Sequence, residues 1–292
     1  MIRFFLKILV FTFIGTCSLS AQSLLQYRLN IGDSITVRQH ATQNIVQCEQ
    51  GVEHKILNNL DENYTFKVAA KTDSTYKLKF HFNQFKLKTT SNKFGILVDV
   101  DTNKPAAEDD TEGKIFGGLT HSELQIEMSF SGEIIHVLGA EEMINNMISL
   151  SGIDDEFTKQ LMIESMKAEF GNESLSKSFE QLTHIYPKQK VNIGDTWKNE
   201  YSGDVNSKNT WKLEKLSDNI VLNAESTLSM IIEDEFTNLL LKGKQNIVVI
   251  ADKKTGFINE MTVNAEASNA VDLNHPNSNP TKVTSITTYK IK

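Results

Sequence analysis

The sequence has few of the features that tie a chain to a known chemistry, and cysteine is the scarcest. It has two cysteines, and only Cys48 lies after the first 21 residues, so no disulfide can form within the rest of the chain. We interpret Cys48 as a small strand residue that alternates with Val46, because no neighbouring motif would activate its thiol. A chain of this length buries a large core without disulfides.

Long apolar runs and catalytic motifs are also missing. No run after the N-terminal segment approaches the roughly eighteen residues that a membrane-spanning helix needs. There is no Gly-x-Ser-x-Gly, no glycine loop for phosphate and no Cys-x-x-Cys, and the seven histidines are scattered singly. A zinc site would need ligands from distant segments. We therefore predict a non-catalytic protein without a cofactor, and a hydrolase with an unrecognised site stays as an alternative.

One acidic segment has part of the pattern of a calcium loop. Alternating oxygen ligands are available at Asp99, Asp101 and Asn103. The EF-hand pattern requires glycine at its sixth position and glutamate at its twelfth, and the sequence has Lys104 and Asp110 there. We prefer to interpret residues 102–114 as an exposed, mobile acidic loop, with calcium binding as the alternative.

The first 21 residues have the three parts of a secretory signal peptide. Arg3 and Lys7 make a positive start, residues 8–14 are apolar but too few to span a bilayer, and Ser20-Ala21 is a small-residue cleavage site. We expect export to the periplasm or the extracellular space. The alternative is an outer-membrane lipoprotein anchored at Cys17, the one way in which we expect a membrane contact.

Cleavage of this segment changes the charge balance. Without residues 1–21, 28 basic and 37 acidic residues remain, a net charge of −9. A chain this acidic is not expected to bind nucleic acid.

Alternating apolar and polar residues predict strands. The clearest case is residues 76–82, Tyr-Lys-Leu-Lys-Phe-His-Phe, which predicts a strand with one buried face. The alternation then shifts by one residue, which predicts a β-bulge near Asn83 or Gln84. Similar alternation recurs in residues 64–70, 124–130, 220–224 and 261–267.

The pattern between residues 140 and 186 is helical instead. Gly152, Gly171 and Pro187 are the predicted helix breaks, and the Asp154-Asp155-Glu156 cluster is expected to cap a helix. A helical wheel over residues 154–170 has two nearly opposite apolar sides, one with Phe157, Leu161 and Ala168 and the other with Met162, Ile163, Met166 and Phe170. A helix of this kind is expected to pack between two surfaces.

These elements predict a β-dominated α+β fold. We expect one or more long curved antiparallel sheets with a helical insert packed against them. The expected divisions are a signal peptide at 1–21, a first β segment at 22–139, the insert at 140–187 and a second β segment at 188–292, with 22–292 forming one compact unit.

The two β segments open alike, with Leu29-Asn30-Ile31-Gly32-Asp33-Ser34 and Val191-Asn192-Ile193-Gly194-Asp195-Thr196. An internal duplication explains this repeat. Independent origin of a simple Gly-Asp turn explains it equally well.

Methionines concentrate in the helical insert, where flexible thioethers could line an adaptable apolar pocket or fill the core. If helices and sheet enclose a cavity, the candidate lining residues are Met143, Met147, Met162, Met166 and Phe170.

Three short motifs are distinctive: Tyr27-Arg28-Leu29-Asn30-Ile31-Gly32-Asp33, residues 132–139 (Gly-Glu-Ile-Ile-His-Val-Leu-Gly) and residues 193–197 (Ile-Gly-Asp-Thr-Trp). With the signal peptide, they make the chain resemble a family of uncharacterised secreted bacterial proteins, the domain of unknown function six-two-six-three. The resemblance covers nearly all of residues 22–292. It implies an exported envelope protein with no assigned activity and supplies no catalytic residues.

Two functions of different classes follow. The first is a ligand-binding protein that holds a hydrophobic small molecule between sheet and helices. The second is an envelope assembly protein with a solid core, which predicts an exposed apolar patch on one sheet face, where another envelope protein binds.

Overall fold

The computed structural model describes residues 22–49, 51–203, 205–233, 238–269 and 280–292. The elements in these ranges, in chain order, are β1 (Ser34–Glu49), β2 (Val52–Lys71), β3 (Thr75–Ser91), β4 (Gly95–Asp101), α1 (Thr111–Gly117), the 3-10 helix η1 (Gly118–His121), β5 (Leu124–Ser129), β6 (Ile134–Leu138), α2 (Ala140–Ser149), α3 (Glu156–Phe170), α4 (Asn172–Thr183), β7 (Thr196–Tyr201), β8 (Val205–Leu216), β9 (Asn219–Glu233), β10 (Asn238–Asp252), β11 (Ile258–Ser268) and β12 (Thr281–Ile291).

All the strands belong to one antiparallel sheet. Its order is β6-β5-β3-β2-β1-β12-β11-β10-β9-β8-β7, with β4 paired to the free part of β3. Each half is a meander of strands that follow one another in the chain, and the two halves meet where β1 pairs with β12, from Val37 opposite Ile291 to Gln47 opposite Thr281. The β-dominated α+β fold with a long antiparallel sheet and a helical insert is therefore confirmed.

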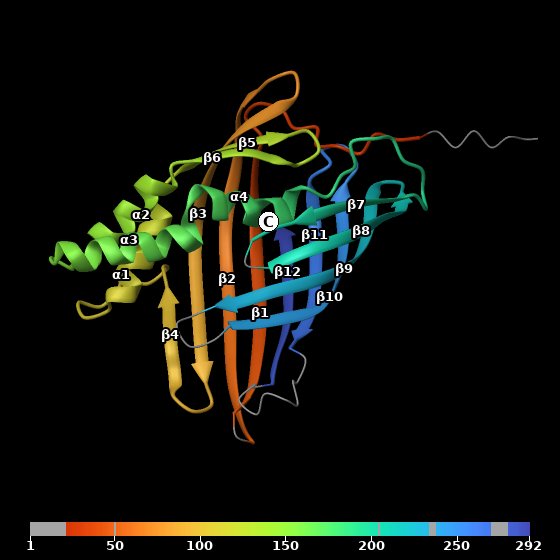
Figure 1. The fold of residues 1–292 in the computed structure, drawn as a ribbon. Coiled ribbons are helices and arrows are strands. Elements are labelled where there is room, and N and C mark those ends of the chain that lie inside the picture. The colour runs from red at the N-terminus through yellow and green to blue at the C-terminus, as the bar shows by residue number, and fades with distance from the viewer. Residues whose placement is uncertain (1–21, 50, 204, 234–237, 270–279) are drawn as a thin grey trace, which may run out of the picture.

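The sheet curls so that β7–β10 cross over the face of β1 and β12 (Figure 1). Within the curl, β10 and β11 approach closely at Gly243, where a Cβ atom would lie 1.9 Å from the Glu266 carbonyl oxygen of β11. Glycine in a strand interior is typical of such a close approach. A predicted bulge bends the other half, because Asn63 pairs with Gln84 and Tyr64 pairs with Phe82, which leaves Asn83 extra.

The repeated motif forms the same turn at the start of each half. The Asn30 N–H donates to Asp33 Oδ2 at 2.7 Å, and the Asn192 N–H donates to Asp195 Oδ2 at 2.8 Å. The intervening glycines have φ of 94° and 93°, values that favour glycine over other residues. A shared turn is compatible with either origin of the repeat, so the duplication stays a prediction.

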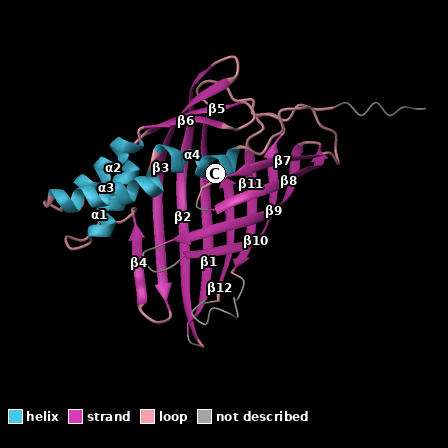
Figure 2. Cartoon of the chain, viewed as in Figure 1, coloured by secondary structure: helices cyan, strands magenta, loops and turns pink. Residues whose placement is uncertain are grey.

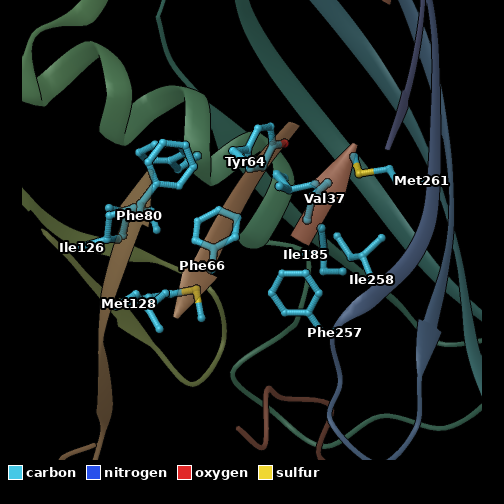
Figure 3. Packing of buried hydrophobic residues seen from close by; sticks show 14 of the residues in the cluster. Val37, Tyr64, Phe66, Phe80, Ile126, Met128, Ile185, Phe257, Ile258 and Met261 are labelled. Atoms are coloured by element: carbon cyan, nitrogen blue, oxygen red, sulfur yellow. The ribbon is translucent and has the colours of Figure 1, made fainter. Parts of the chain in front are cut away.

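The largest core cluster fills the space inside the curl. Figure 3 shows the rings of Tyr64, Phe66 and Phe80 lying together, with Phe257 and Ile258 nearby on the opposite half. The Phe66 and Phe80 ring centroids are 5.1 Å apart. Because residues of both halves contribute to one cluster, the curl is held by apolar burial as well as by strand pairing.

The helices occupy two places (Figure 2). α4 lies inside the curl, where the Phe179 ring is 4.7 Å from the Phe80 ring and the Thr183 hydroxyl donates to the Gly132 carbonyl at 2.6 Å. The other helices, α1, α2 and α3, pack together beside β3 and β4. Gly152, Gly171 and Pro187 break the helices as predicted, and Asp155 caps α3 by accepting from the Thr158 N–H. Among the described residues, no helix has the length and apolarity to cross a membrane.

Two local predictions were wrong. α3 packs on one side only: Met162, Met166 and Phe170 lie against the core, whereas Phe157 and Leu161 are 72% and 57% exposed. The prediction failed because α3 lies at the outer edge of the molecule, where no described element packs against its other side. The segment 102–114 is also not all loop, since α1 begins at Thr111 with Asp110 as its cap.

The close approach at Gly243 can be tested by adding one methyl group. We expect Gly243→Ala to lower the free energy of unfolding by about 1–3 kcal/mol, because β10 or β11 must move to make room. Chemical denaturation followed by circular dichroism measures this. Lys244→Ala, the next residue of β10, is the control, and equal stability of the two variants would show that the contact does not constrain the sheet.

Candidate functional site

The curled sheet forms a partly open cavity of about 150 Å³ below α4. Its walls come from both halves of the sheet and from one residue of α4. The apolar lining residues are Val205, Leu228, Met230, Ile247, Met261, Val263, Ala265, Ala267 and Val283. The polar lining residues are Gln43, Gln181, Tyr201, Gln245, Glu266, Ser285, Thr287 and Tyr289.

Strand register explains why a space remains at this point. Cross-strand neighbours on the concave face meet in rows, and one such row places Ala265 of β11 between Ser285 of β12 and Gln245 of β10. Nearer α4, the same face carries tyrosine and phenylalanine rings that fill the interior. Small side chains in the middle rows leave the gap that forms the cavity.

A polar hollow lies directly outside the cavity, between α4 and the turn from β7 to β8. The two spaces share Gln181 and Val205 in their walls. The hollow also presents Lys177, Ser178 and Ser202. Together they form an apolar interior with a polar entrance, which is the arrangement that suits an amphipathic molecule.

Glu62 is the one carboxylate in the concave row that runs across the top of the cavity. In this row Glu62 of β2 lies opposite Gln39 of β1, Gln39 lies opposite Tyr289 of β12, and Tyr289 lies opposite Met261 of β11. Tyr289 and Met261 both line the cavity. The Tyr64 hydroxyl donates to Gln39 Oε1 at 3.3 Å, so the amide of the row is engaged within the protein.

Glu62 itself is buried without a partner. Its exposure is 9%, and in the described part of the chain its carboxylate has no hydrogen bond or ion pair. The fully enclosed side-chain atoms that lack a partner belong to other described residues, His54, Asn63 and Asn192, so the Glu62 oxygens are not completely enclosed. Burial, and secondarily the neighbouring charge of Asp61, raises the pKa of Glu62 to about 7.

The methionines of the helical insert do not line this cavity. Met143 and Met147 of α2 are fully buried in the core cluster, and Met162, Met166 and Phe170 of α3 are half-buried against it. The cavity lies instead between the two halves of the sheet and α4. Sequence reasoning located the methionines correctly in the helices, but the helices that carry them pack beside the sheet rather than inside the curl.

The calcium candidates are engaged by lysines. Asp99 pairs with Lys88 at 3.0 Å, and Asp101 pairs with Lys86 at 3.3 Å. The Asn103 backbone N–H donates to the Asp101 carboxylate at 3.2 Å. Within the described residues, no three histidine, cysteine or acidic side chains converge as they would around a metal ion.

Glu62 was not predicted from the sequence, although a signal for it was present. The alternation of Tyr64, Phe66 and Val68 places even-numbered residues of β2 on the buried face, and one step back along this series reaches Glu62. A carboxylate in phase with buried aromatic residues indicates an ionisable group in the interior.

Comparisons with known proteins address the fold and the family. A family model described as a family of unknown function (DUF6263) matches residues 73–258. No curated protein matches the sequence. A solved structure described by the words "lipid-protein interactions in lipovitellin" aligns with 91% of this chain at a TM-score of 0.55 and 9% identity, which shows a shared fold. This chain spans 25% of the lipovitellin chain.

A second structure is less similar. An outer membrane channel from Pseudomonas putida F1 aligns with 91% of this chain and 98% of its own length, at 8% identity. Its TM-score of 0.26 is too low to indicate a shared fold.

The raised pKa of Glu62 makes stability depend on pH. The folded state holds the Glu62 proton up to about pH 7, whereas the unfolded chain releases it near its ordinary pKa of 4.5. Stability is therefore lost as the pH rises through this interval, by about 3 kcal/mol in total, since one pKa unit corresponds to about 1.4 kcal/mol. We expect Glu62→Gln to abolish this loss between pH 5 and 8.5 in denaturation experiments.

Glu225 of β9 supplies the control, because it is an exposed carboxylate on the opposite, convex face. Glu225→Gln should follow the wild-type pH dependence. A Glu62→Gln protein that loses stability with pH as steeply as the wild type would contradict the assignment.

Proposed function

The chain belongs to the family of unknown function DUF6263, and we propose that it is a non-catalytic binding protein whose curled sheet holds a lipid-like amphipathic molecule. The observation that carries the proposal is the cavity between the two halves of the sheet, with its apolar walls and polar entrance. The proposal replaces the methionine-lined site with one built from strands.

The size of the cavity limits what it can hold. Cavities of about 150 Å³ accommodate a group as large as benzene. We therefore expect part of an acyl chain or a small ring inside, with the remainder of the ligand outside the cavity, where the polar hollow at Gln181 and Ser178 is one neighbouring space. A molecule with two long acyl chains would require the halves of the sheet to separate.

The shared fold with lipovitellin supports a lipid as the ligand class. The lipovitellin structure is described in terms of its lipid–protein interactions. A curled antiparallel sheet offers a wide concave surface, and fold alone does not fix a ligand. In this chain the small residues of the middle rows provide the space that the proposal needs.

The composition of the cavity wall supports a non-catalytic role. Ser285 and Thr287 offer hydroxyl groups, but no histidine, cysteine or lysine is among the described residues of the wall. A hydroxyl nucleophile needs an adjacent base to activate it. The hydrolase alternative therefore has less support than ligand binding.

A second candidate function is an interaction with another envelope protein. It is favoured by the exposed side of α3, where Phe157 and Leu161 lie one helical turn apart, and by Leu150 nearby in sequence, which is 46% exposed. This patch lies on a helix, whereas the interaction hypothesis predicted it on a sheet face. The two functions are distinguished by whether a ligand co-purifies with the protein.

We expect Ala265→Phe to abolish binding of a fluorescent fatty-alcohol analogue and to remove any lipid that solvent extraction recovers from the wild-type protein. The new ring occupies the middle of the cavity, where Ala265 lies between Ser285 and Gln245. Fluorescence titration and mass spectrometry of the extract measure the two effects.

Asn264→Phe is the matched control, because it adds the same ring to the exposed face one residue away. Ala265→Leu provides a smaller replacement if the phenylalanine variant does not fold, which circular dichroism checks first. Unchanged binding in a folded Ala265 variant would reject the cavity as the site.

We also propose that the protein is exported, with the N-terminal segment removed. Residues 1–21 lie outside the described residues, so the support is the sequence pattern of Arg3, Lys7 and Ser20-Ala21. Mass spectrometry of protein from cell fractions is expected to give a mature chain that starts at Gln22. A chain that starts at an acylated Cys17 would identify a tethered lipoprotein instead, and an intact Met1 would contradict export.

A further inference from the structure

Glu62 is placed to recognise the head group of a ligand. It is the one buried carboxylate of the concave row above the cavity, and its neighbours in the row are the amide of Gln39 and the phenol of Tyr289. We propose that Glu62 is the anchoring residue of the ligand site and that it selects a ligand with a cationic amine head group on an apolar chain. This inference rests on the proposed function and names its ligand class.

The Glu62 carboxylate has no partner among the described residues. A buried carboxylate is normally compensated by a cation or by several hydrogen bonds, because removal of its charge from water is costly. Other carboxylates of the sheet follow this rule, as in the pair of Arg38 and Asp61 on the outer face and the pair of Lys86 and Asp101 between β3 and β4. Glu62 lacks such a cation among the described residues, so a ligand that brings one would supply the missing partner.

Glu62 lies near the cavity but does not line it. Its oxygens are not completely enclosed, although the residue is 9% exposed, and Tyr289, in the same row, lines the cavity. A ligand in the cavity therefore lies two strand positions, about 10 Å, from the carboxylate, and its head group reaches Glu62 by extending along this row past Tyr289 and Gln39. The carboxylate of a fatty acid would meet like charge there, whereas an ammonium group would form a charge-assisted hydrogen bond.

The described groups that surround Glu62 do not supply an alternative cation. Gln39 and Tyr289 are neutral, and Phe85 of β3 is its partner on the other side. Tyr64, two residues after Glu62 in β2, lies in the adjacent row, and its hydroxyl already donates to Gln39. The nearest charge is Asp61, which points to the outer face and pairs with Arg38. The arrangement therefore favours a cation from outside the protein.

The test compares three probes with the same twelve-carbon chain: dodecylamine, 1-dodecanol and dodecanoate. Each displaces a fluorescent hydrophobic dye from the protein expressed from its full-length sequence, at pH 8. We expect the wild type to bind dodecylamine at least roughly tenfold more tightly than dodecanoate. Glu62→Gln should remove most of this preference for the amine over the carboxylate. Glu62→Asp, which keeps the charge, should retain part of the preference.

Two controls separate the outcomes. Glu225→Gln removes one charge from the outer face, so it corrects for attraction of amines to the acidic protein as a whole and should leave the ratio unchanged. Binding of 1-dodecanol reports on the cavity alone. If dodecanol binds but Glu62→Gln leaves the ratio of amine to carboxylate at the wild-type value, the Glu62 assignment is overturned and the binding function stands. If dodecanol displaces no dye, both the binding function and the Glu62 assignment are rejected.

Discussion

Pairing between β1 and β12 is the constraint on which the rest of the structure depends. These strands lie 232 residues apart at their nearest described ends, Glu49 and Thr281, and they join two meanders into one sheet. Their register aligns the concave rows of both halves, so that Glu62, Gln39, Tyr289 and Met261 fall into one line. A shift by one residue would turn the side chains of one half outward and remove the common core.

The cavity follows from how this core is distributed. Close to α4, aromatic rings from β2 and β3 pack against Phe179 and against residues of β11, and they fill the interior. Farther from α4 the rows carry alanine, serine and threonine, and a separate small cluster forms around Leu241, Ala267 and Val283. Packed side chains thus fill the interior on both sides of the cavity. The cavity itself stays open because backbone pairing holds the strands in place.

Glu62 connects stability with the proposed function. A buried carboxyl without a partner opposes folding once it ionises, and a phenylalanine or leucine at this position would match its row. Retention of such a residue is typical of binding sites, where a group that costs stability in the empty protein gains its partner from the ligand. The cavity also costs stability in the empty protein, because a filled interior would bury more apolar surface.

The sequence alone determined the local features. Alternation located the strands and the bulge at Asn83, glycine and proline located the helix ends, and the repeated Asn-Ile-Gly-Asp motif marked two equivalent turns. These features depend on neighbouring residues, whose chemistry is readable in order along the chain. The family was also recognisable from short motifs.

Tertiary structure decided which surfaces meet. Only the curl of the sheet leaves α3 with one free side, places the methionines of the helical insert away from the cavity and gathers Gln43, Gln181 and Tyr289 around it. Glu62 was in phase with buried aromatic residues in the sequence, but its lack of a cation could be known only once every neighbouring strand was placed. Periodicity reports the face on which a side chain lies, whereas the partner across that face is set by contacts between residues far apart in the chain.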